Sequence, residues 1–147
     1  MVKDGSRGWG VRAVETLFAV WIGAMIAIAF VAAPLVFRGV PEYITTKDLA
    51  GRVIGPAFGR IDFLGVVACV GVLTVLLKQR PASRWRRGVI GLLLIGSLAD
   101  GLWIAPQITA RAEPLRVYHG VATGIWMTAI LLGLFLLLVG VTGSRND

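Results

Sequence analysis

Four long apolar runs, joined by short polar links, constrain the fold of this chain more than any other feature. They cover about residues 13–33, 61–77, 88–105 and 117–141. Because an α-helix rises about 1.5 Å per residue, such runs can cross a hydrocarbon core of roughly 30 Å, and the second run is short but adequate. We therefore predict an all-α membrane protein, a four-transmembrane-helix bundle that forms one domain over residues 1–147.

The composition also indicates a membrane protein. Hydrophobic residues make up 56% of the chain and charged residues only 16%, whereas a soluble domain usually has about a quarter of its residues charged. The net charge of +7 comes from basic residues in the links between apolar runs, which indicates membrane topology and excludes a nucleic-acid surface. The expected surroundings are a lipid bilayer and the expected location is multi-pass, in a bacterial inner membrane.

The first run also has features of a cleaved signal peptide. It follows a basic start and ends in the small residues Val31, Ala32 and Ala33, which are typical of a cleavage site. However, the run is longer than the apolar part of a typical signal peptide, and Pro34 would follow the cut. We expect an uncleaved first span.

The basic link between the second and third runs determines the expected topology. It contains Lys78, Arg80, Arg84, Arg86 and Arg87 and no acidic residue, and short basic links stay in the cytoplasm. Both termini are then cytoplasmic, and the other two links lie outside. Within the first outer link, residues 48–60 are expected to form a short interfacial amphipathic segment, broken at its Gly-Pro pair.

This topology places several polar residues at the outer ends of the spans. The two carboxylates and the single histidine of this group are accompanied by arginines from the outer links. The candidate binding residues are His119, Asp100, Asp62, Arg60 and Arg116.

Asp100 is the least expected of these residues. It lies about 7 to 8 Å of helix rise inside the expected end of the third span. A carboxylate at that depth is costly unless it faces the bundle interior and finds a partner, for which His119, Arg60 and Arg116 are candidates. The alternative is an aspartate close enough to the interface to be hydrated.

His119 and Asp62 each allow two interpretations. His119 could bind a metal, accept a proton or sense pH, or it could be an interfacial residue that bonds to a loop carbonyl. On a helix it shares a face with Thr123 and Trp126, which would make a polar pocket. Asp62 is interpreted first as an N-terminal helix residue favoured by the helix dipole.

The sequence does not assign a cofactor, a metal or a reaction. Two carboxylates and one histidine would suit a hard or borderline metal ion, but their linear spacing does not support a site. A single axial histidine would be a weak basis for haem, and no P-loop, dinucleotide fingerprint or hydrolase motif is present. Cys69 is interpreted as a packing residue.

Small residues recur at helical spacing on three of the spans. Gly23 lies between Ala19 and Ala27, Ser97 precedes Gly101, and Gly120 and Gly124 precede Thr128. Such residues allow helices to approach closely in lipid. We expect Gly23, Gly120 and Gly124 to pack helices within the chain, and the alternative is contact with another subunit in a homo- or hetero-oligomer.

Short motifs in all four spans resemble a family of small four-helix membrane proteins known only as a domain of unknown function, with TMEM-type relatives in eukaryotes. The motifs are Trp21–Phe37, Ala50–Asp62, Ile104–Ile108 and Arg116–Trp126. The positions typical of that family are occupied by Trp21, Gly23, Pro34, Phe37 and His119, whereas Val117-Tyr118 stands where a Phe is often found. The resemblance implies the fold and the membrane location, and the eukaryotic relatives are associated with tolerance of toxic compounds.

Three functions fit these observations. The first is a non-enzymatic membrane protein that binds, or helps to move, a small solute or metal ion through an outer-facing polar pocket. The second is an accessory or structural subunit that docks through the GxxxG face of the fourth span. The third is a haem- or metal-linked membrane oxidoreductase, for which one histidine offers little support. The order of preference is as given, with a non-enzymatic role before an enzymatic one.

Overall fold

The computed structural model describes residues 4–38, 46–79, 83–110 and 115–143, and these residues form helices and short connections without a β-strand. Four stretches are long and apolar enough to cross a membrane, namely Gly8–Leu35, Gly55–Lys78, Arg84–Thr109 and Arg116–Val139. The prediction of an all-helical fold with four membrane-spanning helices is confirmed, and the protein is a multi-pass membrane protein.

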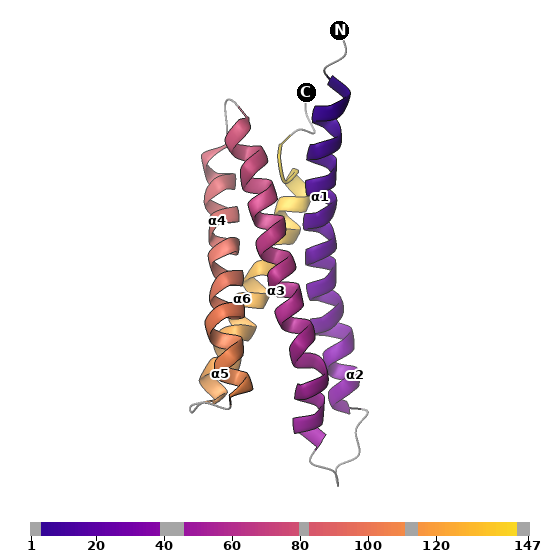
Figure 1. The fold of residues 1–147 in the computed structure, drawn as a ribbon, viewed down its shortest axis with the longest axis vertical. Coiled ribbons are helices and arrows are strands. Elements are labelled where there is room, and N and C mark those ends of the chain that lie inside the picture. Colours follow the sequence, from indigo (N-terminus) through magenta and orange to yellow (C-terminus); the bar gives the residue numbers. More distant parts are fainter. Residues whose placement is uncertain (1–3, 39–45, 80–82, 111–114, 144–147) are drawn as a thin grey trace.

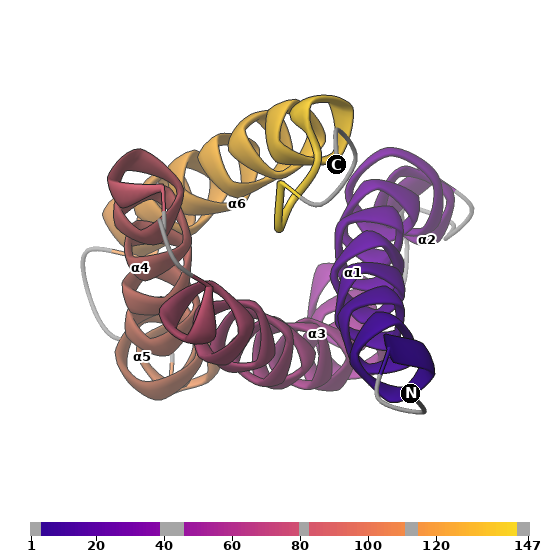
Figure 2. The same ribbon diagram turned by 90° about the horizontal axis from the view of Figure 1, so that it is seen from above.

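The four spans follow one another around the bundle in chain order (Figures 1 and 2). α3 packs against both α1 and α4, and α6 packs against α4 and α1, which closes the ring. The elements are α1 (Asp4–Ala27), η1 (Ile28–Ala32), α2 (Ala33–Arg38), α3 (Thr46–Lys78), α4 (Arg84–Ala99), η2 (Asp100–Ile104), α5 (Ala105–Thr109) and α6 (Leu115–Val139).

The bundle has two ends, which we name from the chain. The terminal end is the end at which α1 begins, α3 ends, α4 begins and α6 ends (Figure 1). The distal end is the opposite one, where α2 and α5 lie. That the terminal end faces the cytoplasm stays a prediction from the basic link.

Two of the predicted boundaries were wrong because the helices continue through prolines. Residues 48–60 were expected to form a separate interfacial segment, but they belong to α3, which begins at Thr46 and contains Pro56 in its interior. Pro106 was expected to stop the third span, but α5 continues the helix to Thr109. A proline removes one helical hydrogen bond, and helices in a membrane bundle tolerate this where their neighbours support them.

A π-helical turn precedes the proline in both the first and the third span. In η1 the N–H of Ala33 donates to the carbonyl of Ile28, and Pro34 follows. In η2 the N–H of Ala105 donates to the carbonyl of Asp100, and Pro106 follows. Because a π-turn bonds to the carbonyl five residues back, it shifts the bonding pattern just before a residue that has no N–H to give. The helices therefore continue toward the distal end.

The core is built around Trp21, which is fully buried on α1. Its indole lies against the backbone of α3, where a Cβ at Gly65 would be 2.6 Å from the indole Nε1. Phe18 contacts Trp21 edge-on, with ring centroids 5.4 Å apart. A glycine at position 65 is therefore required for α1 and α3 to approach this closely.

The glycines predicted to pack the helices do not do so within the described part of the chain. Gly23, Gly120 and Gly124 are exposed, and a Cβ at any of them would meet nothing within 4 Å. Close approach instead depends on Gly65 against Trp21 and on Gly133 against Ile22 of α1. Helical spacing shows that small residues share a face, but it does not show which way that face points.

Replacing Gly65 with alanine is expected to destabilise the bundle by about 1–3 kcal/mol, because the new methyl group would overlap the rigid indole of Trp21. The change is measured as a fall in Tm in detergent. Gly59→Ala, on the same helix and with open space around it, is the matched control and should leave Tm unchanged or slightly higher. Equal Tm values for the two variants would contradict the close contact between α1 and α3.

Candidate functional site

Two buried carboxyl groups lie together in the distal half of the bundle, and we call Asp62 and Asp100 the acid pair. Asp62 is on α3 and Asp100 is the first residue of η2, and each side chain is only 3% exposed. A Cβ added at Gly101 would lie 3.3 Å from the Cβ of Asp62, so a side chain there would crowd this aspartate. Because Gly101 directly follows Asp100, this contact places the two aspartates next to one another where α3 meets η2.

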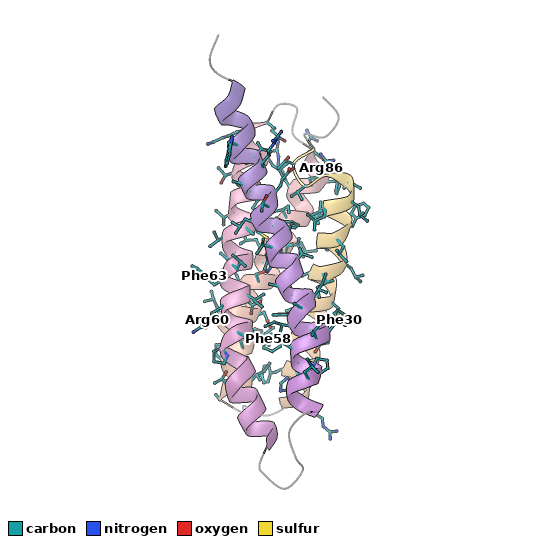
Figure 3. All side chains as sticks on the ribbon, turned by 90° about the vertical axis from the view of Figure 1, so that its right-hand side faces the viewer. Phe30, Phe58, Arg60, Phe63 and Arg86 are labelled. Carbon is teal, nitrogen blue, oxygen red and sulfur yellow. The ribbon has the colours of Figure 1, made fainter. Side chains whose placement is uncertain are left out.

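α6 contributes a hydrogen-bond donor to the acid pair. The indole Nε1–H of Trp126 donates to Oδ2 of Asp100 at 2.9 Å, and the bond is buried. Phe58 of α3 packs edge-on against Trp126, with ring centroids 4.6 Å apart. Figure 3 shows Phe58 between the helices, whereas Phe63 and Phe30 point outward. Three of the four spans are thus joined around one carboxyl group.

The first span also places a polar atom in this region of the bundle. Trp21 Nε1 is buried and has no hydrogen-bond partner. It lies against Gly65, about one helical turn beyond Asp62 on the same face of α3. Every span therefore contributes a carboxyl group or an indole to this level of the bundle.

The acid pair retains unsatisfied oxygens. Asp62 Oδ2 and Asp100 Oδ1 are buried and have no hydrogen-bond partner, and within the described residues no Lys, Arg or His forms an ion pair with either group. Asp100 lies about 14 Å of helix rise from the end of α5, and Asp62 about 10 Å from Gly55. At that depth in lipid an uncompensated negative charge is strongly unfavourable.

Of the five predicted binding residues, the structure brings together only Asp62 and Asp100. His119, Arg60 and Arg116 are exposed, and Arg60 lies on the outer surface of α3 (Figure 3). The predicted face of His119, Thr123 and Trp126 is divided, because Thr123 donates its hydroxyl to the His119 carbonyl of its own helix while Trp126 turns inward. Within the described part of the chain, no three His, Cys, Asp or Glu side chains come close enough to hold a metal.

The interpretation of Asp62 as a helix N-terminal residue was wrong. α3 begins at Thr46, about four turns earlier, so the dipole at its first turn does not reach Asp62. The role of Trp126 as the partner of Asp100 was not predicted, because the sequence only placed Trp126 on the same helix face as His119 and Thr123. A usable signal is the presence of a tryptophan within the apolar run of a span, because a buried indole usually finds an acceptor.

Replacing Trp126 with phenylalanine is expected to lower stability by about 1–3 kcal/mol, because Asp100 Oδ2 loses the one donor that the described residues give it while remaining buried. The measurement is Tm in detergent. Trp103→Phe is the matched control, since Trp103 is exposed on η2, the π-helical turn that contains Asp100. A loss of stability no larger than that of the control would contradict the importance of this hydrogen bond.

The comparisons with known proteins give one match. A family model described as a domain of unknown function (DUF4149) matches residues 16–114, roughly two thirds of the chain. The matched region contains both members of the acid pair, whereas Trp126 and His119 lie beyond it. No curated protein and no solved structure matches.

Proposed function

We propose that this chain, which belongs to the DUF4149 family, binds a small hard cation or a proton at the acid pair. The observation that supports this proposal is the burial of two carboxyl groups together, each with an unpartnered oxygen. Two like charges in a low-dielectric interior repel one another, and neither has a basic side chain to neutralise it among the described residues. A bound cation would provide the missing positive charge.

The chemistry of the pair favours a particular class of ion. Carboxylate oxygens suit protons and hard cations such as Na⁺, Mg²⁺ and Ca²⁺, whereas soft metals prefer thiolates and imidazoles. Cys69 lies about two turns along α3 from Asp62, and His119 is exposed. The donor set of the acid pair is therefore limited to oxygen, with the indole of Trp126 holding one carboxylate in place.

Binding is favoured over movement across the membrane. Beyond the acid pair and the buried Ser97, which lies one turn from Asp100, the core toward the terminal end consists of fully buried apolar side chains such as Phe18, Val72, Leu76 and Leu136. Such a layer offers no ligands to a travelling ion. The resemblance to eukaryotic TMEM-type proteins associated with tolerance of toxic compounds would fit a protein that handles small solutes, and it does not specify one.

Thermal stability in detergent across a series of cations tests this proposal. The cation that binds should stabilise the wild type saturably, by about 2.7 kcal/mol at a hundred times its Kd. The double variant Asp62→Asn/Asp100→Asn keeps the shape of the pair without its charge. It should lose this dependence and be at least as stable as the wild type without added cation.

The series covers Na⁺, K⁺, Mg²⁺, Ca²⁺, Mn²⁺ and Zn²⁺ at fixed pH, followed by a pH titration without added metal, which separates metal binding from proton binding. His119→Ala serves as a control for effects at the exposed distal surface. The same cation and pH dependence in the wild type and in the double variant would refute the proposal.

A second candidate function is that of a subunit in a larger membrane complex. It is favoured by Gly120, Gly124 and Thr128, which form an exposed stripe on α6 that no part of the described chain covers. Small residues facing lipid would allow close approach of another helix. Crosslinking in native membranes tests this: Gly124→Val should abolish any crosslinked species, whereas Gly23→Val on α1 should not. Crosslinks unaffected by Gly124→Val would remove this candidate.

A further inference from the structure

We propose that residues Gly140–Gly143, which follow α6 and which we call the strap, close the terminal end of the bundle interior. In Figure 2 the chain leaves α6 and turns toward the middle of the bundle. The side chains of Val141 and Thr142 are both 2% exposed, and Val141 belongs to the same apolar cluster as the core of the bundle. This inference does not depend on the proposed cation site.

Glu15 of α1 holds the strap from one side. Its Oε1 accepts a hydrogen bond from the hydroxyl of Thr142 and a second one, at 3.3 Å, from the Thr142 backbone N–H. The Glu15 carboxyl group thereby obtains two donors, and the strap is attached to the first span. Hydrogen bonds to a charged group are stronger than those between neutral groups.

Arg86 of α4 holds the strap from the other side. Its Nη2–H donates to the carbonyl of Val139, the last residue of α6, at 3.2 Å. The guanidinium also lies against Gly143, where a Cβ would collide with it. Figure 3 shows Arg86 at the terminal end, beside the chain that leaves α6. The strap is therefore fixed between the first and third spans.

Two glycines give the strap its shape. Gly140 and Gly143 have φ values of 81° and 78°, in the left-handed region that side chains disfavour. Gly140 directly follows α6, where a left-handed residue ends the helix and redirects the chain. This turn carries Val141 into the bundle. A chain that continued in the direction of α6 would instead leave the membrane.

The strap covers an apolar layer that water would otherwise reach. Leu76 lies just before the end of α3 at Lys78 and is completely buried in the same cluster as Val141. Water at this layer would have a way into the core from the terminal end. The contacts of Glu15 and Arg86 with the strap keep that end closed.

Cysteine accessibility of the full chain in nanodiscs, where both ends meet water, tests the strap. Cys69→Ala provides the background, Leu76→Cys reports on the layer beneath the strap, and Ile104→Cys, from a side chain 2% exposed in the distal half, reports on global unfolding. Each reporter is treated with a membrane-impermeant maleimide, with and without Thr142→Val. Thr74→Val is the matched control, because that hydroxyl bonds only within its own helix.

We expect Leu76→Cys to react slowly, and Thr142→Val to accelerate it about tenfold or more, as for the loss of a hydrogen bond to a charged group. Thr74→Val should have no effect, and Ile104→Cys should stay slow throughout. Gly143→Ala, which strains the strap without touching Glu15, should also accelerate the reaction at Leu76→Cys.

Three results would overturn the proposal. A fast reaction at Leu76→Cys in the unaltered background would show that the terminal end is already open. A slow reaction in both Thr142→Val and Gly143→Ala would show that the helices close this end by themselves. An equal increase in the maleimide reaction rate at Leu76→Cys and Ile104→Cys would show that the whole bundle unfolds, without a separate opening of the strap.

Discussion

A carboxyl group inside lipid must have a partner for its charge, and the distal half of this bundle is arranged around that requirement. Asp100 accepts a hydrogen bond from the indole N–H of Trp126, and Asp62 lies on the neighbouring helix against Gly101, the residue that follows Asp100. The small residue Gly101 leaves room for Asp62. Because unpaired polar groups cost far more in the membrane than apolar contacts gain, these few atoms favour one register of the spans over others.

The two halves of the bundle differ in character. The distal half holds the acid pair and the π-turn at Asp100, and the two buried indoles, Trp21 and Trp126, lie at the level of the pair. The terminal half is apolar in its core and has its polar contacts at its edge, where Glu15 and Arg86 meet the chain that leaves α6. A buried site that is closed toward one end fits binding from the other end better than passage through the bundle.

The sequence predicted the four spans because hydrophobic length is a direct consequence of membrane thickness. It also identified Asp100, since a carboxylate within an apolar run is costly wherever its helix packs. The packing partners of Gly23, Gly120 and Gly124 were less predictable. A stripe of small residues is equally compatible with a neighbouring helix of the same chain and with a helix of another chain. The orientation of each helix about its own axis decides between them.

The distal boundaries were misjudged for a related reason. Pro56 and Pro106 are helix breakers in isolated peptides, but in this bundle the surrounding helices and a π-turn keep the chain helical. Asp62 therefore lies well inside α3, and Asp100 lies deeper than its distance from Pro106 suggested. Pairing between the two carboxyl groups depends on how α3 and η2 pack, which a linear pattern does not record.

Infrared difference spectroscopy between the wild type and Asp62→Asn/Asp100→Asn, in lipid and with varied cation and pH, tests the central proposal most directly. The carbonyl band of a protonated carboxyl group and the bands of a carboxylate are distinct, so the difference spectrum reports the state of these two residues. The proposal predicts bands that change saturably with one cation or with pH. Bands of two carboxylates that do not respond to any cation or to pH would contradict it.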